Sequence, residues 1–114
     1  MSYQVRIMGS AQADIHEVYR YIATDLQNPD AAVRRIEAIE ASIKSLKEMP
    51  AGFPLVSDGY LASKGVRMVV VKSHLVFFVI RDEVKKVSIM RVLYARRDWV
   101  RILGADVGRL GDSL

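Results

Sequence analysis

The chain has 114 residues, of which 51% are hydrophobic and 26% are charged. That composition supplies one hydrophobic core and excludes an intrinsically disordered chain. Three prolines and seven glycines exclude a collagen-like or linker-dominated chain. The absence of cysteine excludes disulfide scaffolds, thiolate zinc sites, iron–sulfur clusters and thiol nucleophiles.

Nothing in the sequence points to export or to a membrane. The N-terminus has no long apolar segment, so no signal peptide is expected. The longest apolar runs, 69–71 and 75–80, are too short to cross a bilayer. Together with the missing cysteines, this predicts a cytoplasmic protein with no membrane partner.

The positive charge is concentrated in one third of the chain, although the net charge is only +4. Residues 1–63 carry six Lys and Arg against eight Asp and Glu, whereas residues 64–101 carry ten against three. Such a stretch is typical of a surface that binds a polyanion or an acidic protein. The alternative is a solvated face that keeps the protein soluble.

The first half of the chain predicts one strand and two helices. Apolar and polar residues alternate over 3–8, which indicates a half-buried strand that ends at Gly9, with Ser10 as a helix cap. Apolar residues then recur at helical spacing over 11–26 and again after Asn28 and Pro29, which are expected to be the cap and the first residue of a second helix. Pro50 stops the second helix, and the short connection predicts an antiparallel hairpin.

The second half predicts three strands. Residues 50–65 are rich in proline and glycine and are expected to form an irregular crossing loop. Stretches rich in β-formers follow at 66–72, 75–81 and 84–94, with a tight turn at 72–74. The order β-α-α-β-β-β predicts an α+β fold in which an N-terminal helical hairpin packs on an antiparallel sheet. One domain is expected over residues 1–103, and 104–114, which contains three glycines, is expected to form a C-terminal tail.

Several chemistries have no supporting motif. The only histidines are His16 and His74, and no metal-ligand spacing is present, so neither a metal nor a cofactor is expected. No phosphate-binding glycine loop and no serine-hydrolase elbow occur. Carboxylate pairs such as Asp14 and Glu17 are interpreted as solvated helix faces.

Arginines recur along the predicted sheet. Arg67 begins the first strand of the meander, Arg81 ends the second, and Arg91 lies within the third. An unpaired arginine is costly to bury on an apolar strand face. Arg91 therefore either opens onto a cleft or pairs with a carboxylate, for which the candidates are Asp58, Asp98 and Glu48.

The segment that ends the last strand combines cations with aromatic residues. Arg96 and Arg97 lie between Tyr94 and Trp99, so they could hold phosphates beside stacked bases, or bind an acidic protein. Trp99 could equally pack against the helices. In a metal-independent RNA cleavage, arginines would stabilise the phosphorane charge, and His74 or Tyr94 would move protons. The alternative for His74 is a non-catalytic turn residue.

Two segments, 65–80 and 87–99, resemble the RelE/ParE toxin superfamily. The N-terminal half agrees, because 13–23 resembles the family's first helix and 46–50 resembles the end of its second. The similarity covers about residues 3–100. The long hairpin, together with Gly65-x-Arg67 and the Arg91-Val-Leu-x-x-x-Arg97-Asp pattern, is more similar to the ParE branch.

The resemblance implies the toxin of a bacterial or archaeal type II toxin–antitoxin pair, as found in plasmid stabilisation systems. It implies a cognate antitoxin, and a complex that binds operator DNA through the antitoxin. The ParE branch implies growth inhibition by binding DNA gyrase, and the alternative is a RelE-like endoribonuclease that cleaves mRNA on the ribosome. Residues expected to bind the target or the antitoxin are Arg67, Arg81, Arg91, Arg96, Arg97 and Trp99. If the protein is a nuclease, the expected catalytic residues are Arg67, His74, Tyr94 and Arg96.

Overall fold

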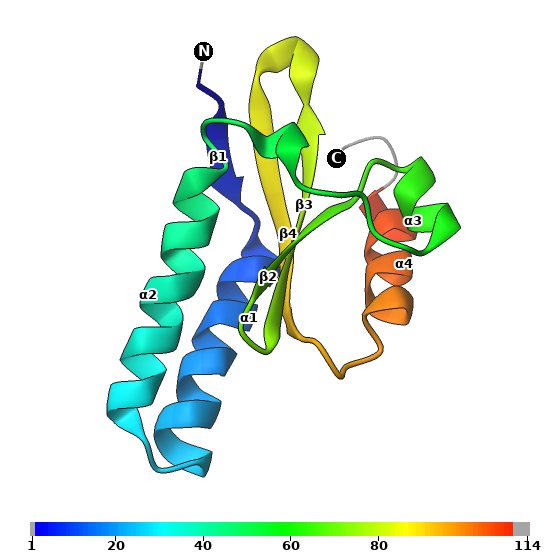
Figure 1. The fold of residues 1–114 in the computed structure, drawn as a ribbon. Helices are drawn as coiled ribbons and strands as arrows, with labels where there is room; N and C mark the ends of the chain where they lie inside the picture. Colours follow the sequence, from blue (N-terminus) through cyan, green and yellow to red (C-terminus); the bar gives the residue numbers. More distant parts are fainter. Residues whose placement is uncertain (1, 111–114) are drawn as a thin grey trace.

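A four-stranded sheet with strand order β1-β4-β3-β2 forms the centre of the computed structural model, which describes residues 2–110 (Figure 1). The strands are β1 (Gln4–Ile7), β2 (Arg67–Val71), β3 (His74–Arg81) and β4 (Lys86–Tyr94). Strands β2, β3 and β4 form the predicted antiparallel meander. Strand β1 instead pairs parallel with β4, so the sheet is mixed and not wholly antiparallel. Parallel neighbours need a long crossover, which the helices and the meander between β1 and β4 provide.

The helical hairpin consists of α1 (Gly9–Arg20) and α2 (Pro29–Ser45), and α1 continues into a π-helical turn at Tyr21–Asp25. Asn28 caps α2 as predicted, because its side chain accepts a hydrogen bond from the N–H of Ala31 at 3.1 Å. The predicted cap at Ser10 is wrong: α1 begins at Gly9, two residues earlier than such a cap requires, and has no side-chain cap. The second helix also ends at Ser45, before the expected stop at Pro50.

Two further α-helices lie where the sequence predicted irregular chain or a tail. Helix α3 (Gly59–Ser63) interrupts the expected crossing loop and is capped by Asp58, whose side chain accepts from the N–H of Leu61 at 3.0 Å. Helix α4 (Trp99–Leu110) runs through the expected boundary at residue 103, so 104–110 belong to a helix and not to a separate tail. The physical reason is burial, because Leu103 and Val107 pack in the core. Residues 111–114 of the expected tail lie outside the described residues.

The sheet is buried on both faces by different helices. On one face, Val76 and Phe78 pack in a core cluster with residues of α1 and α2. On the other face, Leu75 and Phe77 pack with residues of α3 and α4. This double cover explains why β3 is apolar at successive positions, and it confirms the α+β fold with a helical hairpin on one face of the sheet. No helix within 2–110 is long and apolar enough to span a membrane.

Arg91 connects the helices that cover the two faces of the sheet. Its guanidinium lies 2.7 and 2.8 Å from the carboxylate of Asp14 on α1, and 3.2 Å from Asp106 on α4. Asp14 also accepts the backbone N–H of Val92 at 2.9 Å, beyond the end of the β1–β4 pairing. The expected partners Asp58, Asp98 and Glu48 were therefore wrong, and Asp14 does not belong to a solvated helix face. Asp14, Arg91 and Asp106 are called the arginine clamp below.

We predict that Asp14→Ala lowers the free energy of unfolding by about 3–5 kcal/mol, because it leaves a largely buried guanidinium short of its main partner. The matched control is Glu17→Ala on the same helix, since Glu17 pairs with Arg20 only at the exposed surface, and its loss is expected to change the stability far less. Urea denaturation measures both values. Equal losses in the two variants would contradict a structural role for the clamp.

Candidate functional site

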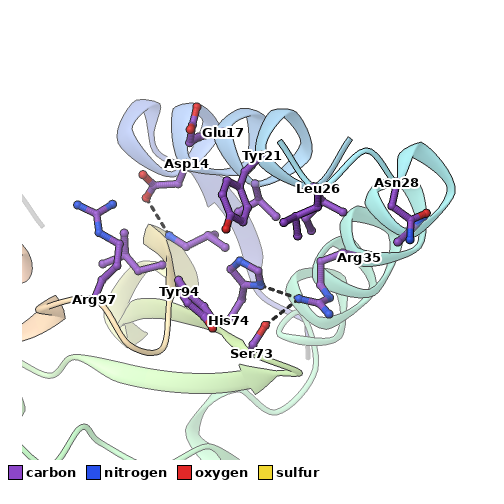
Figure 2. A pocket seen from close by; sticks show the side chains of 15 residues that line it. Asp14, Glu17, Tyr21, Leu26, Asn28, Arg35, Ser73, His74, Tyr94 and Arg97 are labelled. Carbon is purple, nitrogen blue, oxygen red and sulfur yellow. Dashed lines mark hydrogen bonds between the residues drawn. The ribbon is translucent and has the colours of Figure 1, made fainter. Parts of the chain in front are cut away.

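A cavity of about 550 Å³ opens between the helical hairpin and the sheet, where β3 begins and β4 ends (Figure 2). We call it the hairpin groove. Its apolar lining comes from both helices and from β4: Val18, Tyr21, Ile22, Leu26, Ala31, Val92 and Leu93. Its polar lining is Asp14, Glu17, Asn28, Arg35, Ser73, His74, Tyr94 and Arg97.

His74 lies at the polar side of the groove and is buried, with 8% of its surface exposed. It is the first residue of β3 and lies opposite Tyr94 of β4, with the two ring centroids 5.7 Å apart. Arg35 of α2 reaches the same turn and donates hydrogen bonds to His74 Nδ1 at 2.9 Å and to Ser73 Oγ at 3.0 Å. Figure 2 shows this contact between helix and turn.

The Arg35 contact fixes the state of the imidazole. A guanidinium only donates hydrogen bonds, so Nδ1 of His74 must be the unprotonated acceptor, and Nε2 carries the hydrogen. Burial and, to a lesser degree, the charge of Arg35 lower the pKa of His74 below its ordinary value. His74 is therefore neutral at neutral pH. In this state its basic nitrogen is occupied, and its remaining N–H is a hydrogen-bond donor.

Only some of the expected site residues lie together at the groove. Tyr94 and Arg97 line it with His74, and the exposed Arg96 precedes Arg97 in the same turn. Arg67 lies four residues before the β2 position opposite His74, about 13 Å along the strand. There it donates to the backbone carbonyl of Phe53 at 2.7 Å.

The other expected site residues lie elsewhere. Arg81, at the far end of β3, pairs with Glu83 at 3.3 Å, and Arg91 is held in the arginine clamp. Trp99 packs within the fold, with its ring centroid 5.2 Å from that of Phe77 on β3, so its main aromatic contact is with the sheet and not with the helices as the alternative expected. Asp98 pairs with Arg101 at 3.4 Å. It therefore does not neutralise Arg96 or Arg97, which precede it in the chain.

Sequence reasoning missed Arg35 and the π-helical turn. Arg35 adjoins the apolar stripe of α2 that contains Ala32, Ile36 and Ile39, so its position beside the sheet could have been read from the helical period. The π-helical turn places Tyr21 and Ile22 in the groove and has no comparable signal. No group of three or more potential metal ligands occurs within the described chain.

Comparison with known proteins identifies the family. The family model for the ParE toxin of the parDE type II toxin–antitoxin system matches residues 5–99. Because this match spans most of the chain, the chain belongs to the ParE toxin family, and the predicted membership of the RelE/ParE superfamily is confirmed. The family implies a cognate antitoxin as partner. No match is found among curated proteins.

Solved structures share the fold at low sequence identity. The chromosomal ParDE system of P. aeruginosa gives a TM-score of 0.69 at 18% identity, over 83% of this chain and 98% of that chain. The RelBE2 toxin–antitoxin complex of Mycobacterium tuberculosis gives 0.59 at 21%, over 82% and 99%. A mutant of the E. coli toxin RelE in the free state gives 0.59 at 14%, over 96% and 99%. These likenesses show the RelE/ParE-like fold.

We predict that His74 makes the protein less stable as the pH falls below about 6.5. The unfolded histidine has a pKa of about 6.5, and the folded pKa is lower, so the unfolded state binds more protons between the two values. Stability is therefore constant above this window and falls through it. The charged and titratable groups that line the groove beside His74 are Arg35, Tyr94, Arg97 and the carboxylates of Asp14 and Glu17.

Urea denaturation at pH 8 and pH 5.5 measures this effect. His74→Gln should remove most of the difference between the two conditions. The control His16→Gln, on the exposed surface of α1, should preserve it. An unchanged pH dependence in His74→Gln would show that the buried imidazole is not its source.

Proposed function

We propose that this ParE-family toxin inhibits growth by binding DNA gyrase, and that its antitoxin neutralises it by occupying the hairpin groove. The observation that carries this proposal is the contact between Arg35 and His74. It removes from the groove the side chain best suited by type to move protons near neutral pH. The rest of the groove lining includes apolar side chains and cations, which suit it to binding a partner.

RNA cleavage without a metal needs a proton acceptor for the 2′-hydroxyl, cations at the phosphorane and a proton donor for the leaving oxygen. In the described geometry, Nδ1 of His74 is occupied and Nε2 is protonated, so the imidazole accepts no proton. Arg67 is bound to backbone carbonyls at a distance from the groove, and Arg91 is held by two carboxylates. These positions support binding over cleavage.

The groove suits a protein segment with apolar and acidic side chains. Tyr21 and Leu26 are among the exposed large hydrophobic residues and form part of its wall. Such residues supply most of the affinity in interfaces, because charges at the rim contribute little. Arg96 and Arg97 would attract an acidic segment and fix its register. We infer an extended or helical antitoxin segment that covers part of both arginines.

The second candidate function is a ribosome-dependent mRNA endoribonuclease. The observation that favours it is the meeting of His74, Tyr94 and Arg97 at one cavity. In that function Arg96 and Arg97 would stabilise phosphate charge, and Tyr94 or a His74 released from Arg35 would move protons. The 2′-hydroxyl would attack the adjacent phosphate and give a 2′,3′-cyclic product. Primer extension on translated mRNA would detect discrete cleavage within codons.

Expression of the chain without its antitoxin is predicted to arrest growth and induce the DNA-damage response while translation continues at first. Poisoned gyrase leaves damaged DNA, whereas ribosomal mRNA cleavage stops protein synthesis directly. A damage-response reporter and pulse labelling of new protein, followed together, separate the two. Rapid loss of translation without DNA damage would overturn the gyrase proposal.

Replacement of Arg96 and Arg97 together by alanine is predicted to slow antitoxin association roughly 10-fold at low salt and to weaken its salt dependence, because steering charge is lost. Toxicity should also fall. The matched control is Lys44→Ala with Lys64→Ala, which removes the same charge from exposed positions outside the groove. Unchanged kinetics in the arginine variant, measured by stopped flow, would mean that the antitoxin binds elsewhere.

A further inference from the structure

Three cations share one face of the sheet at the end remote from the hairpin groove. Arg81 of β3 is the register partner of Lys86 of β4, and Lys86 is the partner of Gln4 of β1. Register partners lie on the same face, and so do residues two apart on a strand. Arg6, two residues after Gln4, therefore joins Arg81 and Lys86 on that face. We call Arg6, Arg81 and Lys86 the cationic sheet end.

The cationic sheet end is open to solvent. All three of its residues are exposed. Phe77 and Val79, which precede Arg81 on the same face, are buried with residues of α3 and α4. Figure 1 shows the β3–β4 hairpin extending beyond these two helices. The helices thus cover the middle of the face and leave the end with the cations free.

The charges in this cluster are poorly compensated. Directly opposed like charges on neighbouring strands destabilise a sheet, and Arg81 faces Lys86 in this way. Within residues 2–110, neither Arg6 nor Lys86 has a carboxylate within 4.0 Å, and Arg81 has only the exposed Glu83. The remaining acid of the adjacent turn, Asp82, binds Lys85 and the hydroxyl of Tyr3. An anion that binds here would relieve a repulsion present in the free protein.

We propose that the cationic sheet end binds the phosphate backbone of duplex DNA, and that the toxin does so by itself, without the antitoxin. The neighbours of the cations on this face, Gln4 and Ser88, are polar and can donate to phosphate oxygens. Phe77, the aromatic residue of β3 on this face, is fully buried under the helices, so it offers no stacking platform of the kind that single-strand binders use. The cationic sheet end also lacks the large apolar anchors of protein interfaces.

This surface is separate from the surface of the proposed function. Arg81 lies seven residues along β3 from His74, about 23 Å away, and none of the three cations lines the hairpin groove. DNA binding here therefore neither requires nor tests the action on gyrase. Contacts to phosphates alone would be independent of base sequence and strongly dependent on salt.

The test is binding of the purified full chain to a 20-base-pair DNA duplex of arbitrary sequence, followed by fluorescence anisotropy at several salt concentrations. Arg6→Gln with Lys86→Gln should weaken binding at least 10-fold at low salt. It should also reduce the slope of log affinity against log salt by about 2, since each lost phosphate contact contributes about 0.9. The matched control, Arg34→Gln with Lys64→Gln, removes the same charge elsewhere and should change the slope by less than about 0.5.

A thermal melt separates a loss of DNA binding from a loss of folding. Removing the like-charge repulsion should leave the melting temperature of Lys86→Gln unchanged or raise it by about 1–3 °C, while DNA binding falls. Equal losses of DNA binding in the two double variants would overturn the proposal, because attraction would then be a property of the net charge. Tighter binding of a single strand, or stronger competition by polyglutamate than by duplex DNA at equal charge, would overturn it as well.

Discussion

The arginine clamp is the interaction on which the arrangement of this toxin depends. Strand β4 extends beyond β1 and would expose an unpaired edge, but Asp14 covers that edge by accepting both the Val92 N–H and the Arg91 guanidinium. The same guanidinium reaches Asp106 on α4, across the sheet. The hydrogen bonds that Arg91 donates to Asp14 are the main cause of the raised pKa of Arg91. Because the clamp fixes α1, it also fixes the hairpin wall of the groove and the approach of Arg35 to His74.

The basic residues of 64–101 lie at different places in the fold and have different contacts. Arg91 and Arg67 are engaged within the fold by carboxylates and by backbone carbonyls. Arg97 lines the hairpin groove and Arg96 precedes it in the chain, and both remain exposed to a partner. Arg81 and Lys86 lie at the opposite end of the sheet. The basic residues that are close together in the sequence therefore contribute to two separate surfaces, the hairpin groove and the cationic sheet end, and to ion pairs and hydrogen bonds within the fold.

Local patterns predicted the strands, the hairpin, the Asn28 cap and the family, because each of these depends on residues that are close together in the sequence. The clamp could not be predicted in the same way, since its partners lie 77 and 15 residues from Arg91. Helix α4 was missed because its glycines indicated a tail, whereas burial of Leu103 and Val107 stabilises it. The state of His74 depends on Arg35, 39 positions away. Contacts between residues far apart in the sequence thus determine which of the expected site residues are held within the fold and which can bind a partner.

The central claim is that this toxin acts as a binder whose groove histidine performs no proton transfer. The most direct measurement is a titration of purified DNA gyrase with the purified toxin in a supercoiling assay, with His74→Gln beside the wild-type chain. The account predicts that inhibition saturates near equimolar toxin and is retained by the variant. Undisturbed supercoiling at a large molar excess, together with mRNA cleavage at substoichiometric toxin in a translation extract, would contradict it.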